Sequence, residues 1–404
     1  MRASASSPSV LPRVALISAQ RYPHHDADTQ QVMKSATALV RAGLDLQLLI
    51  PPRAGRRGWS RQRRLAELQR FYGLDRSAHI RQLPGWPAGD FQPPVKLWHG
   101  WFGALTAHRE GFGLVYTREW TTVLTCLGLG QPVLFETYRA LGDEHPRLMA
   151  QVARRARRRE LVGLISHSRL AARSFIRSGF DPERVLVAYN GFDPSDMQPP
   201  LEAAAARAAL GLAADAPLVV YTGNMQPNKN LPVLVELAAR VPAARFLLVG
   251  GRPEHVRSLE RLAAERGAGN LSFAGQRPVS EMPRYLYAAD VLIVPPTGKP
   301  LAEHGRTVLP IKTYSYLAAG RAILAPDTAD LRGLLVDGRN ARLVEPDRPE
   351  AAAAALRALL ADPVRRRALA AAALETAAAL TWDARARRII DWLGPLLPAA
   401  AGRE

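Results

Sequence analysis

One segment, residues 290–326, constrains the fold more than any other part of the sequence. It begins with a short, β-branched apolar run (290–295), continues through residues that recur at helical spacing, and ends in a second apolar run (322–325). Pro310 fits an early helical position, where its missing N–H costs nothing, and Gly320 ends the helix. Strand, helix and strand in this order predict a right-handed βαβ unit in a parallel sheet.

The same alternation of short apolar runs and helical segments fills the rest of the chain. It opens with strands at 13–17 and 44–50, and it restarts at 217–222 after a Pro- and Ala-rich segment at 194–216. A chain of 404 residues is long enough for two hydrophobic cores. The sequence therefore predicts an α/β protein with two doubly wound, Rossmann-like domains.

The chain is strongly basic, with a formal net charge of +18. Residues 1–200 hold 28 Lys and Arg against 16 Asp and Glu, a surplus of 12. Such a surplus favours anionic partners, among them nucleic acid, nucleotide phosphates and anionic lipids. We expect no nucleic-acid partner, because no known RNA- or DNA-binding motif occurs and the arginine runs are not interleaved with aromatic residues.

Cysteine usage and hydropathy indicate the compartment. Cys126 is the single cysteine, which excludes an internal disulfide framework and fits a reducing cytoplasm. The first ten residues lack the apolar stretch of a signal peptide, and no run of roughly 18 apolar residues predicts a membrane span. We expect a cytoplasmic protein, with a peripheral position on the inner membrane face as an alternative.

Two segments of the first half leave a membrane-facing surface open. Residues 51–64 form a basic loop broken by Gly and Pro, which is either solvated or lipid-facing. Residues 95–105 place Trp98, Trp101 and Phe102 at helical spacing. That spacing is more typical of a core helix, but an interfacial helix is the alternative.

The segment described first carries a further pattern, formed by Pro310, Lys312, Tyr316, Leu317, Ala318, Gly320 and Arg321. This pattern resembles the donor-site segment of the retaining glycosyltransferases of family 4, whose GT-B fold has two Rossmann-like domains facing a cleft. In that family, one glutamate at the helix start contacts the sugar and a second holds the nucleotide ribose. Thr307 and Ser315 stand at these two places, so the chain resembles a divergent member without the paired glutamates.

The resemblance covers about residues 12–395. The loop from Gly223 to Lys229 resembles the family's diphosphate-binding loop, with Lys229 matching its lysine and Asn224 standing in place of its arginine. The resemblance implies an N-terminal acceptor domain (1–195), a C-terminal donor domain (196–382) and a final helix (383–404) that packs back on the first domain.

The resemblance also implies a donor site. The leaving group would be a nucleoside diphosphate, so cations and backbone N–H groups aimed at its oxygens would stabilise the transition state. Lys229 and Arg306 are the predicted catalytic cations. The predicted donor-binding residues are Gly223, Asn224, Lys229, Gly250, Arg306, Thr307, Val308, Leu309, Pro310, Lys312 and Ser315.

Residues of the first domain are candidates for contact with the acceptor, a glycan or a lipid-linked molecule. They are Asp28, Thr29, Arg118, Glu136, Tyr138 and His145; Tyr138 replaces a family histidine, and a structural role for Glu136 or His145 is the alternative. No metal or other cofactor is expected, since protein cations replace a metal in this family. The leading interpretation is a retaining hexosyltransferase-like enzyme, and the alternative is a GT-B-like nucleotide- or glycan-binding protein that has lost catalysis.

Overall fold

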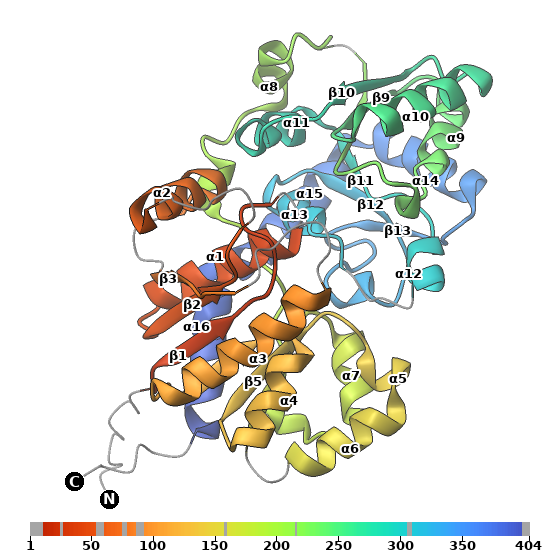
Figure 1. Ribbon diagram of the computed structural model, residues 1–404. Helices are drawn as coiled ribbons and strands as arrows, with labels where there is room; N and C mark the ends of the chain where they lie inside the picture. Colours follow the sequence, from red (N-terminus) through yellow and green to blue (C-terminus); the bar gives the residue numbers. More distant parts are fainter. Residues whose placement is uncertain are drawn as a thin grey trace, which may run out of the picture. The chain divides into compact units, whose positions relative to one another are not determined.

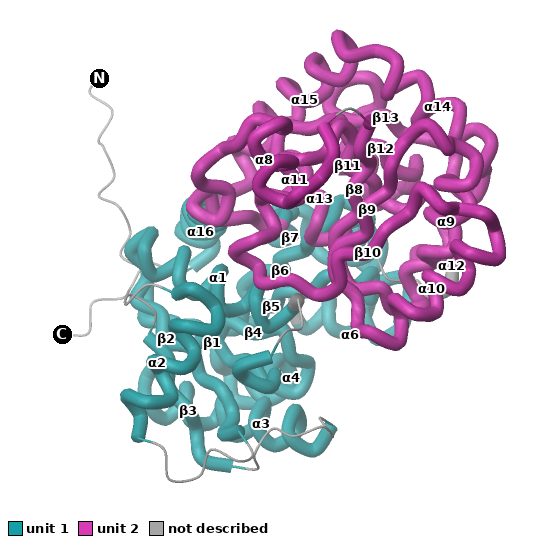
Figure 2. The backbone as a smooth tube through the Cα atoms, turned by 90° about the horizontal axis from the view of Figure 1, so that it is seen from above, with its two compact units in different colours: residues 1–189, 382–404 teal, residues 190–381 magenta. Residues whose placement is uncertain are grey.

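The computed structural model describes residues 11–24, 27–53, 60–74, 79–85, 93–156, 160–214, 216–304 and 309–397. The chain forms two compact units, residues 1–189 with 382–404 and residues 190–381 (Figures 1 and 2). The sequence suggested the boundaries 195/196 and 382/383. None of the described helices is long and apolar enough to span a membrane.

The first unit contains a parallel sheet of seven strands in the order β3-β2-β1-β4-β5-β6-β7. The order reverses between β1 and β4, and the carboxyl ends of the strands at such a point are where open α/β sheets bind ligands. The strands are β1 (Val14–Ile17), β2 (Leu46–Ile50), β3 (His79–Gln82), β4 (Leu114–Thr117), β5 (Val133–Thr137), β6 (Leu161–Ser166) and β7 (Val185–Val187).

Helices cover both faces of this sheet, because alternate strand residues point to opposite faces. Val14 and Leu16 of β1 pack in one core with α1, α2 and α16, while Ala15 and Ile17 pack in another with α3 to α7. The helices are α1 (Ala27–Arg41), α2 (Arg61–Tyr72), α3 (Pro93–Arg109), α4 (Trp120–Leu129), α5 (Leu141–Glu144), α6 (Pro146–Ala156), α7 (Arg169–Arg177) and α16 (Trp382–Leu393).

The second unit contains a parallel sheet of six strands in the order β10-β9-β8-β11-β12-β13, which reverses between β8 and β11. The strands are β8 (Leu218–Thr222), β9 (Arg245–Val249), β10 (Leu271–Gly275), β11 (Val291–Ile293), β12 (Ala322–Pro326) and β13 (Arg342–Val344). The helices are α8 (Ala203–Ala209), α9 (Pro232–Arg240), α10 (Pro253–Glu265), α11 (Met282–Ala288), α12 (Lys299–His304), α13 (Lys312–Ala318), α14 (Pro349–Ala361) and α15 (Pro363–Ala378). The predicted α/β class with two doubly wound sheets is confirmed.

Two local predictions differ from the structure. The core interpretation of Trp98 and Trp101 is wrong, since their side chains are 45% and 44% exposed. Helix α3 instead turns its small residues inward: Gly103 approaches the Ile17 side chain so closely that an added Cβ would lie 3.0 Å away. The helix expected to follow Thr307 begins only at Lys312, so Pro310 precedes it.

Candidate active site

Two glycine turns meet at the carboxyl ends of β8 and β9. Gly223 (φ +142°) follows β8 and Gly250 (φ +115°) follows β9, both in a region that favours glycine. A Cβ on Gly250 would lie 2.2 Å from the carbonyl oxygen of Gly223, and one on Gly223 would lie 2.9 Å from Nζ of Lys312. Any side chain at either position would therefore displace the backbone or the lysine.

Two lysines gather beside these turns. Nζ of Lys312 lies 3.6 Å from the ring centroid of Tyr221. Burial holds the pKa of Lys312 well below its usual value of 10.5, and the neighbouring ammonium of Lys229 lowers it further. Burial also lowers the pKa of Lys229. Neither lysine forms an ion pair with a carboxylate of the described residues.

Clustered cations without counter-charges are costly, because burial and like charge both oppose protonation. A bound anion would remove that cost for Lys229 and Lys312 together. The glycine turns let the backbone after β8 and β9 pack close to Nζ of Lys312. The arrangement is therefore suited to an anion with more than one negative charge.

Buried tyrosines and a left-handed turn hold this site in place. The backbone N–H of Thr222 donates to the Tyr316 hydroxyl (2.8 Å), and the Tyr221 hydroxyl donates to the Asn224 carbonyl (3.0 Å). Asn230 (φ +50°) follows Lys229 and donates from its amide to Thr297 Oγ1 (2.8 Å). These contacts fix the backbone on both sides of the 223–229 loop.

The remaining predicted donor residues fall into two groups, those that the structure describes and those that lie outside the described residues. Arg306, Thr307 and Val308 belong to the latter group, so the predicted catalytic role of Arg306 stays a prediction. Leu309 is buried, Pro310 and Ser315 are partly exposed, and Asn224 is exposed.

In the first unit, Glu136 at the end of β5 is enclosed by protein partners. His167 Nε2 lies 2.6 Å from its Oε1, and Arg385 of α16 donates to its Oε2 at 3.0 Å. The Tyr116 hydroxyl also donates to Oε2, and Nε of Arg118 lies 4.0 Å from Oε1. The carboxylate therefore joins the ends of β4, β5 and β6 to α16.

The electrostatics of this cluster follow from burial and mutual contact. Burial opposes ionisation of Glu136, but Arg385 and His167 hold the pKa of the carboxyl well below its usual range. Burial lowers the pKa of His167 to about 4, although Glu136 acts in the opposite direction. His167 is therefore neutral near pH 7, and the Glu136–Arg385 pair is ionised.

The predicted acceptor-side residues are only partly brought together. The guanidinium carbon of Arg118 lies 5.8 Å from the Tyr138 ring centroid, so Arg118, Glu136 and Tyr138 form one group. Asp28 and Thr29 lie in the first turn of α1, and the Thr29 hydroxyl donates to the His24 carbonyl (2.8 Å).

His145 stands apart from that group, exposed between α5 and α6. Two members of the Glu136 cluster, His167 and Arg385, were not singled out from the sequence. In the described part of the chain, no three His, Cys, Asp or Glu side chains are grouped as metal ligands.

Comparison with known proteins places these sites in a family. Residues 216–362 match the family model described as "Glycosyl transferases group 1". A D-inositol 3-phosphate glycosyltransferase of Thermomonospora curvata is 33% identical over 319 residues, 72% of this chain and 68% of that protein. This chain belongs to the group 1 glycosyltransferases. This chain is also 28% identical to the D-inositol 3-phosphate glycosyltransferase of Xylanimonas cellulosilytica, over 94% of this chain and 96% of that protein.

Solved structures agree on the fold of this glycosyltransferase. Anabaena Alr3699/HepE in complex with UDP matches with a TM-score of 0.71 and 17% identity, over 95% of this chain and 100% of that one. Sucrose-phosphate synthase from Thermosynechococcus elongatus matches with a TM-score of 0.73 and 21% identity, over 96% of this chain and 99% of that one. The predicted GT-B fold and glycosyltransferase activity are confirmed, and the family match lies in the unit that holds Lys229 and Lys312.

Proposed function

We propose that this glycosyltransferase moves a sugar, with retention of anomeric configuration, from a nucleotide-diphosphate sugar to a glycan or lipid-linked acceptor. The observation that carries the proposal is the Lys229–Lys312 pair beside Gly223 and Gly250, which supplies positive charge that a diphosphate would neutralise. The Anabaena protein, of the same fold, has been solved with UDP, UDP-glucose, and UDP with glucose, which supports this donor class.

The two lysines are proposed to stabilise the transition state electrostatically. As the glycosidic bond breaks, negative charge develops on the diphosphate, and cations already aimed at its oxygens stabilise the transition state without rearrangement. The same-face mechanism of retaining family members does not need a strong protein nucleophile. The proposal includes no metal, because the two lysines already supply positive charge at the diphosphate.

The first unit is proposed to bind the acceptor, with Arg118 and Tyr138 in contact with it. Asp28 and Thr29, in the first turn of α1, are assigned to the same side. Glu136 is assigned to positioning Arg118, since its own oxygens are occupied by protein donors. His145 is the weakest member of this group because of its separate location.

One experiment separates this proposal from that of a binding protein without catalysis. The enzyme is incubated with UDP-, GDP- and dTDP-sugars, with and without a lipid-linked acceptor, and nucleoside diphosphate release is measured. Release that depends on the acceptor supports a transferase. Tight calorimetric binding of a nucleoside diphosphate without turnover on any acceptor would favour the binding protein, an alternative that the absence of glutamate at Thr307 and Ser315 motivates.

Ser315 is expected to weaken discrimination between ribose and deoxyribose donors. A carboxylate can accept hydrogen bonds from two ribose hydroxyls, and a serine cannot span both. The loss of one charge-assisted hydrogen bond is worth roughly 1.5–3 kcal/mol. Asp327 does not substitute for the carboxylate freely, because Arg332 donates to both of its oxygens (2.5 and 2.7 Å).

Calorimetric titration with UDP and 2′-deoxy-UDP measures this effect. The wild-type protein is expected to bind both with similar affinity, and Ser315→Glu is expected to prefer UDP. A strong preference of the wild-type protein for the ribonucleotide would show that the interpretation of Ser315 is wrong.

The first unit is also proposed to lie peripherally on anionic membranes of the cytoplasmic face. Leu97, Trp98 and Trp101 of α3 are 61%, 45% and 44% exposed, and the two indole rings lie 5.4 Å apart. Exposed aromatic residues of this kind partition into the lipid interface, and each nearby basic residue adds about 1 kcal/mol on an anionic surface.

Vesicle flotation is expected to show binding to anionic vesicles that falls with salt, and little binding to neutral vesicles. Trp98→Ala with Trp101→Ala should reduce flotation, whereas Leu374→Ala, an exposed apolar residue of the second unit, should not. Equal binding to both vesicle types, or binding to neither, would contradict the proposed association with anionic membranes.

A further inference from the structure

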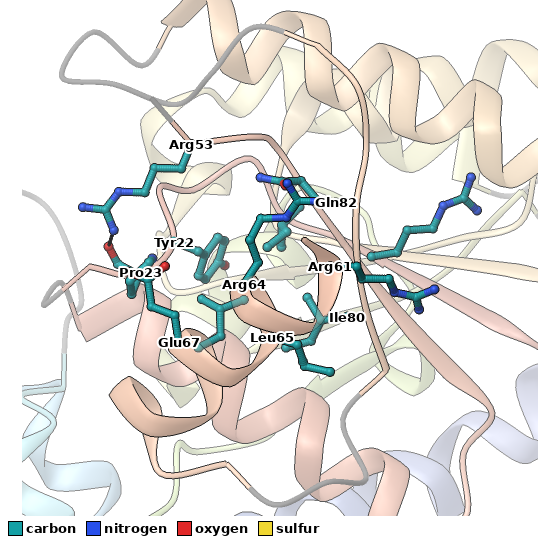
Figure 3. A pocket seen from close by; sticks show the side chains of 12 residues that line it. Tyr22, Pro23, Arg53, Arg61, Arg64, Leu65, Glu67, Ile80 and Gln82 are labelled. Carbon is teal, nitrogen blue, oxygen red and sulfur yellow. Dashed lines mark hydrogen bonds between the residues drawn. The ribbon is translucent and has the colours of Figure 1, made fainter. Parts of the chain in front are cut away.

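The first unit contains a cavity of about 280 Å³ beside α2, shown in Figure 3. Its walls come from α2, the loop after β1 and the carboxyl-terminal ends of β2 and β3. This is the same edge of the sheet as that of the strand-end residues Arg118 and Glu136, since all strands of the sheet are parallel. The cavity belongs to the first unit alone and includes none of the predicted donor residues. Its lining consists of Tyr22, Pro23, Ile50, Arg53, Arg61, Arg64, Leu65, Glu67, Leu68, Ile80, Arg81 and Gln82.

The lining combines an apolar base with cationic side chains. Tyr22, Ile50, Leu68 and Ile80 are 4%, 4%, 5% and 8% exposed and form a well-packed apolar surface. The rest of the lining includes four arginines and one glutamate, Glu67. A small molecule with an anionic group and a less polar body fits such a surface.

The four arginines are not equivalent. Arg81 is bound through one nitrogen to both oxygens of Glu110 (2.9 and 2.7 Å), and Arg53 donates to the Pro23 carbonyl at 2.5 Å. The guanidinium groups of Arg61 and Arg64 form no hydrogen bond or ion pair with any residue the structure describes. Two of the four cations are thus available for an external anion.

Helical geometry explains why these two arginines line one cavity. Arg61, Arg64, Leu65 and Leu68 lie at i, i+3, i+4 and i+7 and share one face of α2. The helix is fixed at its start, where Ser60 accepts from the Arg63 backbone N–H (3.2 Å), and at its end, where Gly73 adopts φ +60°. The arginine pair is therefore carried by a helix with both ends capped.

We infer that this cavity is a phosphate-binding subsite for the acceptor, in which Arg61 and Arg64 contact the phosphate and the apolar base contacts the adjoining part of the molecule. Guanidinium groups suit phosphate because they donate several hydrogen bonds in a fixed plane. The inference rests on the proposed function, which assigns acceptor binding to the first unit. It goes further by proposing that the acceptor carries a phosphate. The phosphate belongs either to a soluble polyol phosphate or to a phospholipid headgroup.

The test compares Arg61→Gln/Arg64→Gln with a matched control, Arg70→Gln, which removes an exposed arginine of the same helix outside the cavity. Calorimetry of the full chain uses glycerol 1-phosphate and neutral glycerol, with and without saturating UDP. Flotation uses vesicles with phosphatidylglycerol and vesicles of phosphatidylcholine alone. Circular dichroism checks that the variants fold.

The wild-type protein and Arg70→Gln are expected to bind glycerol 1-phosphate in the presence of UDP and not to bind glycerol, and the double variant should bind at least tenfold more weakly. If only phosphatidylglycerol vesicles bind, and the double variant loses that binding, the phosphate source is a lipid headgroup. Wild-type binding by the double variant, or no binding of either phosphate probe, overturns the inference. Binding of UDP is read separately, so its failure would count against the proposed function and not against this subsite.

Discussion

A Lys229→Ala variant is expected to lose about 2–4 kcal/mol of transition-state stabilisation, roughly a thirtyfold to thousandfold fall in kcat/KM. Lys229 is partly exposed, and its pKa is lowered by burial with no carboxylate of the described residues in contact. The effect should appear mainly in kcat, because charge on the diphosphate oxygens grows as the sugar departs.

The control for this variant is Arg261→Ala, which removes an exposed cation from α10 in the same unit. The initial rate of nucleoside diphosphate release at several donor concentrations gives kcat and KM for each protein. The control should match the wild-type enzyme. Turnover of Lys229→Ala at the wild-type rate would show that Lys229 is not part of the active site.

The neighbouring Lys312 supplies an independent readout of the same site. A bound diphosphate favours the charged ammonium, so it should raise the lowered pKa of Lys312 and draw a proton from solvent. Because the complex then holds more protons than the free protein, affinity for UDP should fall as pH rises. Calorimetry in two buffers of different ionisation enthalpy measures this proton uptake, and Lys312→Met should abolish it.

The parts of this site that depend on local sequence could be predicted. The runs at 217–222 and 322–325 are short, apolar and β-branched, and they form β8 and β12. Lys229 was predicted from its offset after Gly223 together with the resemblance of this loop to the family's diphosphate-binding loop, and its role stays a prediction. The buried face of α3 could also have been predicted from its small residues. Gly100, Gly103, Ala104 and Ala107 mark that face better than the aromatic residues of the helix do.

The buried cluster around Glu136 could not be predicted in the same way. Arg385 donates to a residue 249 positions earlier in the chain, and only the return of α16 to the first unit brings the two together. One signal existed: Arg385 lies in the same buried stripe as Trp382, Ala386 and Ile389. An arginine within an apolar helical stripe indicates a buried partner, but the sequence does not say which carboxylate that is.

An Arg385→Met variant is expected to lose about 3–5 kcal/mol of unfolding free energy in the first unit, because it leaves the Glu136 carboxylate buried with less compensation. Arg385 is 5% exposed, and it also donates to Ser35 Oγ of α1 at 2.8 Å. Glu136→Gln should cost a similar amount, since it leaves the Arg385 guanidinium without a carboxylate. Arg387→Met, an exposed change on the same helix, is the control and should have little effect.

Tryptophan fluorescence is a selective probe of this unfolding. The first unit holds every tryptophan of the chain, namely Trp59, Trp86, Trp98, Trp101, Trp120, Trp382 and Trp392. Urea titration followed by fluorescence therefore reports the first unit, and UDP binding reports the second. A double Glu136→Gln/Arg385→Met variant that loses much less than the sum of the single losses would show direct coupling.

The same cluster makes the stability of the first unit depend on pH, and the direction follows from the two pKa shifts. His167 has a folded pKa of about 4 against an ordinary value of 6.5, so the unfolded chain binds more protons between these values and stability falls as pH drops through this window. Glu136 has a folded pKa well below 4.5, so its contribution to stability is complete above pH 4.5 and is also lost on further acidification.

Glu136→Gln should remove the loss of stability that comes from Glu136 but keep the loss that comes from His167, whereas His167→Gln should remove the loss that comes from His167. Urea midpoints at pH 7, 5.5 and 4 measure both, and a wild-type midpoint that does not fall from pH 7 to pH 5.5 would contradict the assignment of a neutral, buried His167.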